Sequence, residues 1–230
     1  MKKKIVVLTG AGISAESGIK TFRDAGGLWE EHRIEDVASP EGWSRDKHLV
    51  LSFYNQRRRQ LLLCKPNRAH IALAELEEKY GVTIITQNID NLHELGGSTK
   101  ILHLHGELLK SRSTVDERLV YPCEKDIEIG DKCEKGSQLR PHIVWFGEAV
   151  PMIEMAVPIV READIFIVIG TSLVVYPAAG LINYCAYETP KWLIDPNEIA
   201  LPRIPNLKFI NEKASVGVDY LVSLLMKEAV

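Results

Sequence analysis

The chain has 230 residues, of which 46% are apolar and 26% charged, a composition typical of a globular protein and not of a disordered one. A formal net charge of −3 gives no basic field, which argues against sequence-independent binding of nucleic acid. No apolar stretch approaches the roughly 18–20 residues that span a bilayer, MKKKIVVL is too short for a signal peptide, and the four cysteines are dispersed, so we expect a cytoplasmic protein that does not bind membranes.

The first predicted element, residues 5–8, is an apolar, β-branched strand that stops at a glycine turn and leads into a short helical stretch. Such a turn directs free backbone N–H groups and the positive end of a helix dipole at one point, which predicts a phosphate site. The spacing Gly10-x-Gly12-x-x-Ala15 matches a small-residue variant of the dinucleotide fingerprint, although a tight turn in any α/β domain has the same spacing. The residues that favour a dinucleotide follow directly: Gly18, Phe22 and Arg23.

Short apolar runs alternate with helical patterns along the rest of the chain. Strands are predicted at 5–8, 82–86, 101–105, 165–169 and 192–194, and helices at about 48–62, 68–79, 150–162, 177–187 and 217–228. This alternation predicts an α/β fold with a Rossmann-like, doubly wound parallel sheet that is covered on both faces. Residues 24–70 and 110–140 interrupt the alternation, and we expect these insertions to form a small lobe of a single domain that spans residues 1–230.

Polar or aromatic clusters lie at or just beyond the ends of predicted strands, where ligands bind in open α/β folds. Residues 86–93 (TQNIDNLH) can hydrogen-bond sugar hydroxyls or an amide, although a solvated turn with a helix cap has a similar composition. Residues 170–172 (GTS) offer small residues and hydroxyl groups where a nucleotide could pass close to the backbone. Residues 140–148 are aromatic and apolar, which suits the wall of a site for an extended peptide or an acyl chain.

The strand predicted at 101–105 ends in an H-x-H pair, His103 and His105, which the alternation of side chains places on one face. Zinc binding would need a third ligand from His93 or His142, and most isolated histidines are structural. A histidine at a strand end suits a general base better, because imidazole titrates near neutrality.

A predicted helix carries the sequence YNQRRR at residues 54–59. Tyr54 and Arg57 are three residues apart and share a face of this helix. Consecutive arginines usually form a solvated basic surface, and we expect Arg58 and Arg59 to belong to such a surface.

Together, these clusters resemble the sirtuins, which are NAD-dependent protein-lysine deacylases. The motifs GAGISAESGI, TFR, TQNID, HGE, VWFGE and GTS occur in the family's order over nearly the whole chain. The resemblance implies a Rossmann-like domain with a smaller lobe built from two insertions. It also implies NAD as cofactor and acylated lysine side chains of proteins as substrates, and it leaves the oligomeric state open.

The resemblance also assigns roles to individual residues. His105 matches the family's catalytic histidine, and Asn88 and Asp90 belong to the same catalytic set. The residues expected to bind NAD are Gly10, Ala11, Gly12, Ser14, Ala15, Glu16, Phe22, Arg23, Trp29, Gln87, Asn88, Ile89, Asp90, Gly170, Thr171, Ser172, Asp195 and Ala214. The residues expected to contact the acylated peptide are Tyr54, Arg57, Val144, Phe146, Gly147, Glu148, Val174 and Tyr176.

Tyr54 and Arg57 match the Tyr-x-x-Arg pair of the class III sirtuins, which prefer negatively charged acyl groups. The chemistry agrees, because a neutral acetyl group offers no partner to a buried arginine, whereas a succinyl or malonyl carboxylate can form a bidentate charged pair with it. We therefore expect removal of acetyl groups and, preferably, of succinyl and malonyl groups.

The chain departs from the family in its second insertion, where sirtuins usually hold a structural zinc with two C-x-x-C pairs. Ser113 and Asp116 stand in place of the first pair, and the second pair keeps Cys133 but has Gly136 in place of its partner. Cys123 is too irregularly placed to restore four soft ligands, so we expect no zinc. The apolar residues expected to help pack the lobe instead are Leu119, Val120, Tyr121 and Ile127.

The reaction that the resemblance implies transfers an acyl group from lysine to ADP-ribose and consumes NAD. Its products are free lysine, nicotinamide and O-acyl-ADP-ribose, with His105 as the base that takes a proton from a ribose hydroxyl. A dehydrogenase would need an acidic residue at the end of its second strand, and the acids near residues 30–36 follow no predicted strand. A mono-ADP-ribosyltransferase and a non-catalytic NAD-binding sensor remain as alternatives.

Overall fold

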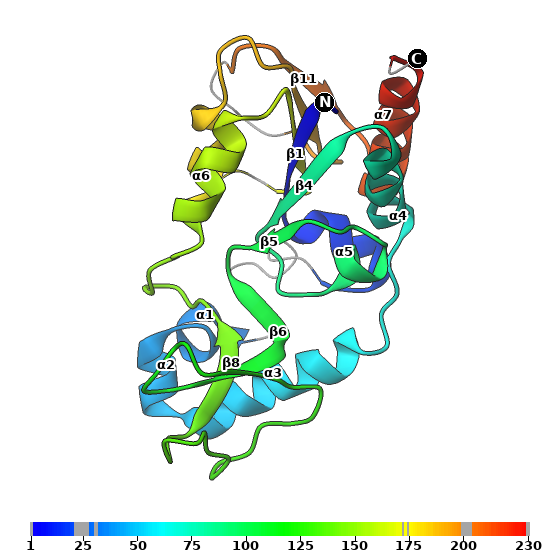
Figure 1. Cartoon of the computed structure of the whole chain (residues 1–230). Helices are drawn as coiled ribbons and strands as arrows, with labels where there is room; N and C mark the ends of the chain where they lie inside the picture. The colour runs from blue at the N-terminus through cyan, green and yellow to red at the C-terminus, as the bar shows by residue number, and fades with distance from the viewer. Residues whose placement is uncertain are drawn as a thin grey trace.

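The computed structural model describes residues 2–20, 28–29, 32–171, 173, 175–198 and 204–228, without the side chains of residues 28, 29 and 228 (Figure 1). Its larger part is built on a six-stranded parallel sheet with the strand order β11-β10-β9-β1-β4-β5. The chain runs outward from the central β1 through β4 to β5, then returns to β9 beside β1 and runs outward in the other direction. This reversal creates a topological switch point between β1 and β9, where α/β proteins bind ligands. The strands are β1 (Lys4–Thr9), β4 (Gly81–Thr86), β5 (Ile101–His103), β9 (Ile165–Ile169), β10 (Lys191–Ile194) and β11 (Leu207–Ile210).

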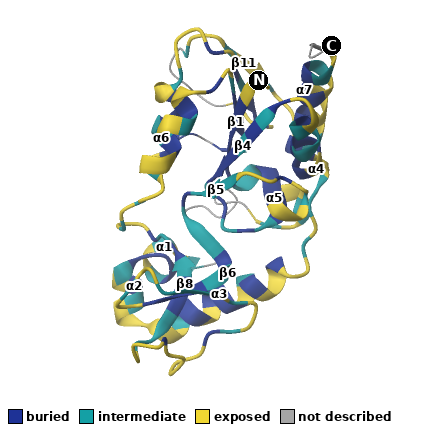
Figure 2. Cartoon of the chain, viewed as in Figure 1, coloured by how far each residue is buried: buried dark blue, intermediate teal, exposed yellow. Residues whose placement is uncertain are grey.

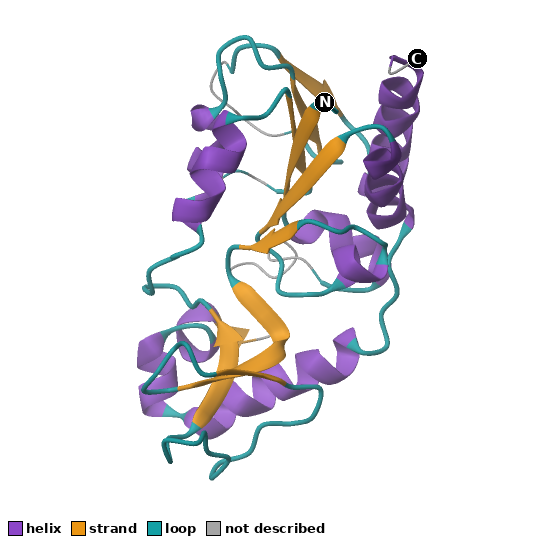
Figure 3. Cartoon of the chain, viewed as in Figure 1, coloured by secondary structure: helices purple, strands orange, loops and turns teal. Residues whose placement is uncertain are grey.

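Helices cover both faces of this sheet, because successive side chains of its strands are apolar on both sides. Ile5 and Val7 of β1 pack with α4 (Arg68–Glu75) and α7 (Ala214–Glu228). Val6 and Leu8 pack with α6 (Ile153–Arg161) and the 3₁₀ helix η4 (Ala178–Tyr184) on the opposite face. Figure 3 shows these two helical layers on either side of the strands. The predicted doubly wound α/β fold is confirmed.

The small lobe, residues 32–61 and 106–148, lies beyond the carboxyl edge of the large sheet (Figure 3). Its core is apolar side chains from both segments, including Val50, Phe53, Leu108, Ile143 and Trp145. One side of α3 is buried on this core and the other is exposed (Figure 2). Its helices are α1 (Ile34–Val37), α2 (Pro40–Arg45) and α3 (Lys47–Leu61), and its antiparallel sheet has the order β7-β6-β8, with β6 (Gly106–Ser113), β7 (Val120–Pro122) and β8 (Leu139–Ile143).

Shorter elements complete the described part of the chain. Strand β2 (Leu28–Trp29) pairs with β3 (His32–Arg33). The 3₁₀ helix η1 (Ala11–Ser17) follows β1, η3 (Leu76–Glu78) follows α4, and α5 (Leu92–Leu95) follows β4. Among the described residues, no helix has both the length and the apolar character needed to cross a bilayer.

Four details differ from the sequence prediction. No strand was predicted within residues 110–140, but the structure has β7 and parts of β6 and β8 there. Strand β11 was not predicted. Helix α4 packs with α7 against the large sheet, so the first segment of the small lobe ends before residue 68. Of the apolar residues expected to pack the lobe, Ile127 is buried, whereas Leu119, Val120 and Tyr121 are only partly buried.

Arg58 was expected on a basic surface, but its side chain is fully buried. Its Nε donates to the carbonyl oxygen of Leu108 at 3.0 Å and its Nη1 to Asn55 Oδ1 at 2.7 Å. Asn55 in turn accepts from the backbone N–H of Ile127 and donates to its carbonyl oxygen. Arg58 and Asn55 therefore tie α3 to both β6 and the 127 segment, whereas Arg59 is exposed, as expected, and pairs with Asp126.

Candidate active site

The loops that follow β1 and β9 meet at the switch point. The N–H of Gly10 donates to the carbonyl oxygen of Ile169 at 3.0 Å, and that of Gly12 to Gly170 at 2.9 Å. A Cβ atom on Gly12 would lie 2.6 Å from the Cα of Gly170, so only glycine allows this approach. The N–H groups of Gly10 and Gly12 therefore hold the two loops together.

Ser14, Asn88 and Asp90 form a buried hydrogen-bonded group beside this loop. Ser14 Oγ donates to Asp90 Oδ2 at 3.0 Å, and Asn88 Nδ2 donates at 3.1 Å to both Ser14 Oγ and the carbonyl oxygen of Gly10. Burial raises the pKa of Asp90, and hydrogen bonds from the Leu92 N–H and Ser14 oppose that rise. The structure thus brings Ser14 together with Asn88 and Asp90, which lie 74 and 76 residues further along the chain.

His105 lies in the turn between β5 and β6, two residues after β5 ends at His103, and is partly buried. Its Nδ1 lies 3.0 Å from the carbonyl oxygen of Gln87, which can only accept, so Nδ1 carries the hydrogen of the neutral ring and Nε2 is an acceptor. Burial lowers the pKa of His105, so the ring is neutral near pH 7. A neutral imidazole with its Nε2 lone pair unprotonated can act as a general base.

His103 contacts the same loop at Asn88, the residue after Gln87. Its Nδ1 lies 3.2 Å from the carbonyl oxygen of Asn88, and its Nε2 lies 2.7 Å from Glu94 Oε1. Burial alone would lower the pKa of His103, but the contacts with Glu94 outweigh it and the pKa is raised. His103 and His105 thus each contact a backbone carbonyl of the 86–90 loop. Within the described residues, no three His, Cys, Asp or Glu side chains are placed to hold a metal.

Other residues expected to bind NAD also lie along the carboxyl edge of the sheet. Gln87 Nε2 donates to Thr171 Oγ1 at 3.2 Å, joining the loops after β4 and β9. Asp195 directly follows β10 and is buried, and exposed Glu16 accepts from the N–H and hydroxyl of Ser215 at the start of α7, next to Ala214. Of the remaining expected residues, Ala15 is exposed, and Ala11 and Ile89 are partly buried. Phe22, Arg23, Ser172 and Val174, with the side chain of Trp29, lie outside the described residues.

Tyr54 and Arg57 lie one turn apart on α3. Tyr54 is fully buried, and its hydroxyl oxygen accepts from Trp145 Nε1 at 3.0 Å. Arg57 is partly buried, with its guanidinium carbon 3.7 Å from the centroid of the Phe53 ring and its Nη1 donating to the Phe53 carbonyl oxygen. Trp145 is a contact that sequence reasoning missed, because only the fold brings residue 145 to residue 54.

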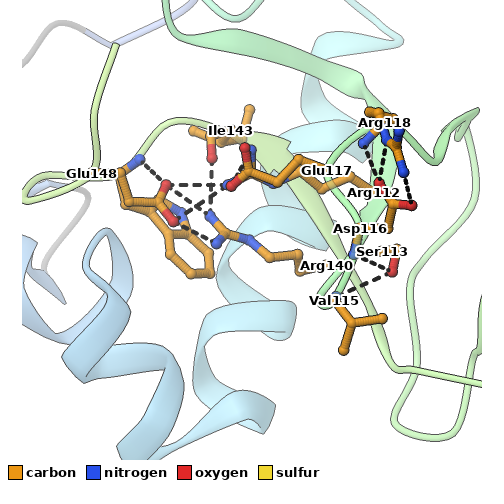
Figure 4. A network of polar contacts seen from close by, with 10 residues as sticks. Arg112, Ser113, Val115, Asp116, Glu117, Arg118, Arg140, Ile143 and Glu148 are labelled. Atoms are coloured by element: carbon orange, nitrogen blue, oxygen red, sulfur yellow. Dashed lines mark hydrogen bonds and ion pairs between the residues drawn. The ribbon is translucent and has the colours of Figure 1, made fainter. Parts of the chain in front are cut away.

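The 144–148 segment runs beside His105, since the N–H of Val144 donates to the carbonyl oxygen of His105 at 2.9 Å. Phe146 and Gly147 are exposed, and Tyr176, which was expected to contact the peptide, is 73% exposed. Glu148 instead turns its carboxylate inward, toward Arg140 and Arg112 (Figure 4). The side chain of Glu148 therefore holds this segment in place.

The positions of the usual sirtuin zinc ligands hold a hydrogen-bonded cluster. Cys133 Sγ lies 3.4 Å from Ser113 Oγ and 3.1 Å from Ser137 Oγ, and the two serine hydroxyls are 2.9 Å apart. Asp116 pairs with Arg118 at 3.0 Å and with Lys135 at 2.7 Å. One thiol with hydroxyl partners does not fit a structural zinc, which takes four ligands such as thiolates and imidazoles.

Comparison with known proteins agrees with this geometry. The Sir2 family model matches residues 10–177. A relative from Bacteroides thetaiotaomicron, called NAD-dependent protein deacylase, is 55% identical over 230 residues, covering 97% of this chain and 98% of the relative. A relative of the same name from Helicobacter pylori is 55% identical over 227 residues and covers 99% of both chains.

Solved structures are similar over the same length. A Sir2 homologue in complex with NAD has a TM-score of 0.89 at 40% identity, covering 100% of this chain and 91% of that one. A mutant Sir2 homologue in complex with 2′-O-acetyl ADP-ribose has a TM-score of 0.88 at 39% identity, covering 99% of this chain and 94% of that one. The chain therefore belongs to the Sir2 family.

Proposed function

We propose that the chain is an NAD-dependent protein-lysine deacylase that removes acetyl and, preferably, succinyl or malonyl groups and releases nicotinamide and O-acyl-ADP-ribose. The observation that carries this proposal is the neutral His105, oriented by the Gln87 carbonyl next to the buried Ser14, Asn88 and Asp90 at the switch point of the sheet. Relatives named as deacylases and neighbours that bind NAD and 2′-O-acetyl ADP-ribose support it.

NAD would lie along the carboxyl edge of the sheet and be consumed as a substrate. The loop of η1 and Gly170 would receive its diphosphate, residues 87–90 its nicotinamide end, and Thr171, Asp195 and Ala214 its adenosine half. In this reaction the acyl oxygen bonds to the anomeric carbon of the nicotinamide ribose as the bond to nicotinamide breaks. His105 Nε2 would then accept a proton from a ribose hydroxyl, whose oxygen bonds to the acyl carbon. The bond from this carbon to the lysine nitrogen breaks and the amine leaves with a proton. Water then adds to the same carbon, and the bond to the anomeric oxygen breaks, which gives O-acyl-ADP-ribose.

The peptide would lie as an added strand between residues 146–148 and 174–176, with the acyl-lysine reaching toward His105. The hydrogen bond from Val144 to His105 supports this placement of the peptide, because it holds the 144–148 segment, one edge of the proposed peptide site, beside His105. Since the Glu148 carboxylate is held by Arg140, its contribution to the peptide would come from its backbone.

Nicotinamide release from one peptide carrying acetyl, malonyl or succinyl lysine, each with NAD, tests the proposal. Release that depends on the acyl group, with one deacylated peptide per nicotinamide, is the expected result. Binding of NAD without turnover of any peptide would favour the NAD-binding sensor. Transfer of labelled ADP-ribose to protein would favour the mono-ADP-ribosyltransferase.

Arg57→Met is expected to lower kcat/KM for the succinyl peptide by at least about tenfold relative to the acetyl peptide. The reason is that a hydrogen bond to a charged group contributes roughly 1.5–3 kcal/mol, and about 1.4 kcal/mol corresponds to tenfold. Arg59→Met is a matched control, because Arg59 lies on the same helix but is exposed and paired with Asp126. A parallel loss on both peptides in Arg57→Met would refute the acyl preference and leave the deacylase intact.

We also propose that the protein needs no zinc. Purified protein is expected to contain well under one zinc per chain, and a chelator is expected to leave its Tm unchanged, because the thiol of Cys133 already donates to Ser113 Oγ and lies in hydrogen-bond contact with Ser137 Oγ. The triple variant S113C/D116C/G136C restores two C-x-x-C pairs and serves as a positive control for metal uptake. Stoichiometric zinc in the unmodified protein, measured by elemental analysis, would contradict the proposal.

A further inference from the structure

We infer that His103 is a positioning residue for NAD: its ring is an imidazolium whose two N–H groups join the Asn88 carbonyl to Glu94, and loss of one proton releases that carbonyl. This inference rests on the proposed function, which places residues 87–90 at the nicotinamide end of NAD, and it deepens that function. It gives the first histidine of the H-x-H pair a role that does not touch the reacting atoms.

His103 lies where three elements meet. It ends β5, is paired in register with Thr86 at the end of β4, and faces Glu94 of α5 (Figure 1). Its Nδ1 lies 3.2 Å from the Asn88 carbonyl oxygen, and its Nε2 lies 2.7 Å from Glu94 Oε1. Only 9% of the His103 side chain is exposed, so the ring depends on these two partners for its hydrogen bonds.

The two partners of His103 decide its protonation state. A carbonyl oxygen and a carboxylate can only accept hydrogen bonds, so both ring nitrogens must donate, and only the imidazolium has a hydrogen on each of them. Burial would raise the pKa of Glu94, but its contacts with His103 and Lys110 outweigh burial and lower it, so the carboxyl group is ionised and the proton stays on the ring. His105 differs, because it is neutral with its Nδ1 on the Gln87 carbonyl.

The other titratable groups around His103 favour the same state. Burial would lower the pKa of His103, but the carboxylates of Glu94 and Glu107 outweigh burial and raise it. Burial raises the pKa of Asp90, and the positive charge of His103 is among the effects that oppose that rise. Burial lowers the pKa of His93, so this neighbour on α5 is neutral. Carboxyl groups from α5, β6 and the 86–90 loop thus interact with the ring, which stabilises its positive charge.

Loss of one proton changes which partner His103 keeps. A neutral ring has one N–H, and the ionised Glu94 is a stronger acceptor than a backbone carbonyl, so the remaining hydrogen goes to Nε2. Nδ1 then presents a lone pair to the Asn88 carbonyl oxygen, and the contact becomes repulsive. The Asn88 side chain donates to Ser14 and to the Gly10 carbonyl, so displacement of Asn88 disturbs this group as well. We therefore expect NAD to bind more weakly when His103 is neutral.

NAD titration across the pH range in which His103 loses its proton tests the inference. Nitrogen-15 spectra of the histidine rings, assigned with His103→Asn, locate that range. At pH 6.5 they are expected to show hydrogen on both ring nitrogens of His103 and on one ring nitrogen of His105. We expect the Kd for NAD to rise by about two- to tenfold as the proton is lost, the effect of one hydrogen bond. The value of kcat at saturating NAD is expected to stay unchanged, because His103 does not contact the reacting atoms.

Two variants separate this role from a merely structural one. Glu94→Gln offers an amide that can donate to Nε2, so a neutral ring keeps its hydrogen on Nδ1 toward Asn88, and the alkaline rise in Kd is expected to disappear. The Glu94 side chain is 40% exposed, so this variant is expected to fold. His103→Asn keeps a donor near the Asn88 carbonyl but has no proton to lose, and its Kd is expected to be independent of pH in this range. Glu107→Gln is the matched control, because Glu107 pairs with Lys110, and it is expected to keep the rise.

Several results would overturn the inference while the proposed function stands. One is a Kd for NAD that stays constant while the spectra show His103 losing its proton. Another is an alkaline rise that persists unchanged in Glu94→Gln, and a third is a single ring hydrogen on His103 at pH 6.5. If the unmodified protein binds no NAD at any pH, the proposed function fails, and the inference fails with it.

Discussion

His105→Ala is expected to bind NAD almost normally and to lose about 10²–10⁴-fold in the rate of deacylation, the range that general base catalysis supplies. His105 is held by a hydrogen bond to the Gln87 carbonyl, so its removal leaves the Ser14, Asn88 and Asp90 group in place. Single-turnover deacylation and NAD titration of the same protein separate the two effects. Because burial lowers the pKa of His105, activity on the acid side is expected to fall only below about pH 6.5.

His48→Ala is the matched control for this experiment, since His48 is exposed on α3 in the small lobe. It is expected to keep both turnover and NAD affinity. Undiminished single-turnover deacylation by His105→Ala would remove this residue from the mechanism. A large loss of NAD affinity in that variant would assign it to binding.

Acid is expected to destabilise the folded protein strongly, because two adjacent histidines are buried in neutral form. His70 and His93 are at most 1% exposed, and their ring centroids are 4.9 Å apart. His93 Nε2 lies 3.0 Å from Thr9 Oγ1, whose own proton goes to Thr86. Among the described residues, neither His70 Nε2 nor His93 Nδ1 has a hydrogen-bond partner. A proton added to His93 at Nδ1 would therefore gain nothing from its surroundings.

The direction of the pH effect follows from proton binding. Burial lowers the pKa of His70 to about 4, with Glu94 opposing, and that of His93 well below its ordinary value of 6.5. Between pH 6.5 and 4 the unfolded chain binds more protons, so the free energy of unfolding falls as the pH falls. For His70 alone the loss is about 2 kcal/mol by pH 5 and about 3 kcal/mol at lower pH. His93 adds to this loss.

Urea unfolding at pH 7.5 and 5.0 measures this effect. We expect the free energy of unfolding of His70→Gln to differ less between these two pH values than that of the unmodified protein, even if the variant is less stable at pH 7.5. His48→Gln, at an exposed site, is expected to keep the full difference. A difference unaffected by His70→Gln would rule out His70 as a source of the acid sensitivity.

The fold of the large sheet could be predicted because its strands are short apolar runs covered on both faces. Residues 165–169 were predicted with their observed bounds, and β1, β4, β5 and β10 to within two residues at each end. β11 was missed because its sequence, LKFI, is an edge strand with a lysine and an exposed phenylalanine. The small-lobe sheet was missed for a related reason, since β6 (GELLKSRS) and β8 (LRPHI) mix polar and apolar residues and β7 has only three residues.

The parts of the site that escaped prediction depend on partners that carry no signal in the sequence. The carbonyl oxygens of Gln87 and Asn88, which orient His105 and His103, belong to the backbone. Arg58 looked like its neighbour Arg59, yet its partners are Asn55, one turn away, and a carbonyl oxygen at residue 108. Side-chain identity could predict which groups gather at the sheet edge, but not which of them orient the others.

The hydrogen bonds by which Arg58 and Asn55 tie α3 to β6 and the 127 segment have a consequence for the order of folding. It joins α3 to residues 108 and 127, while the intervening chain contributes α4, β4 and β5 to the large sheet. Closing so long a loop in an unfolded chain is entropically costly, but a folded sheet already holds the two ends near each other. We therefore expect β4 and β5, which are close in the sequence, to pair early in refolding, and α3 to dock on β6 as a later step.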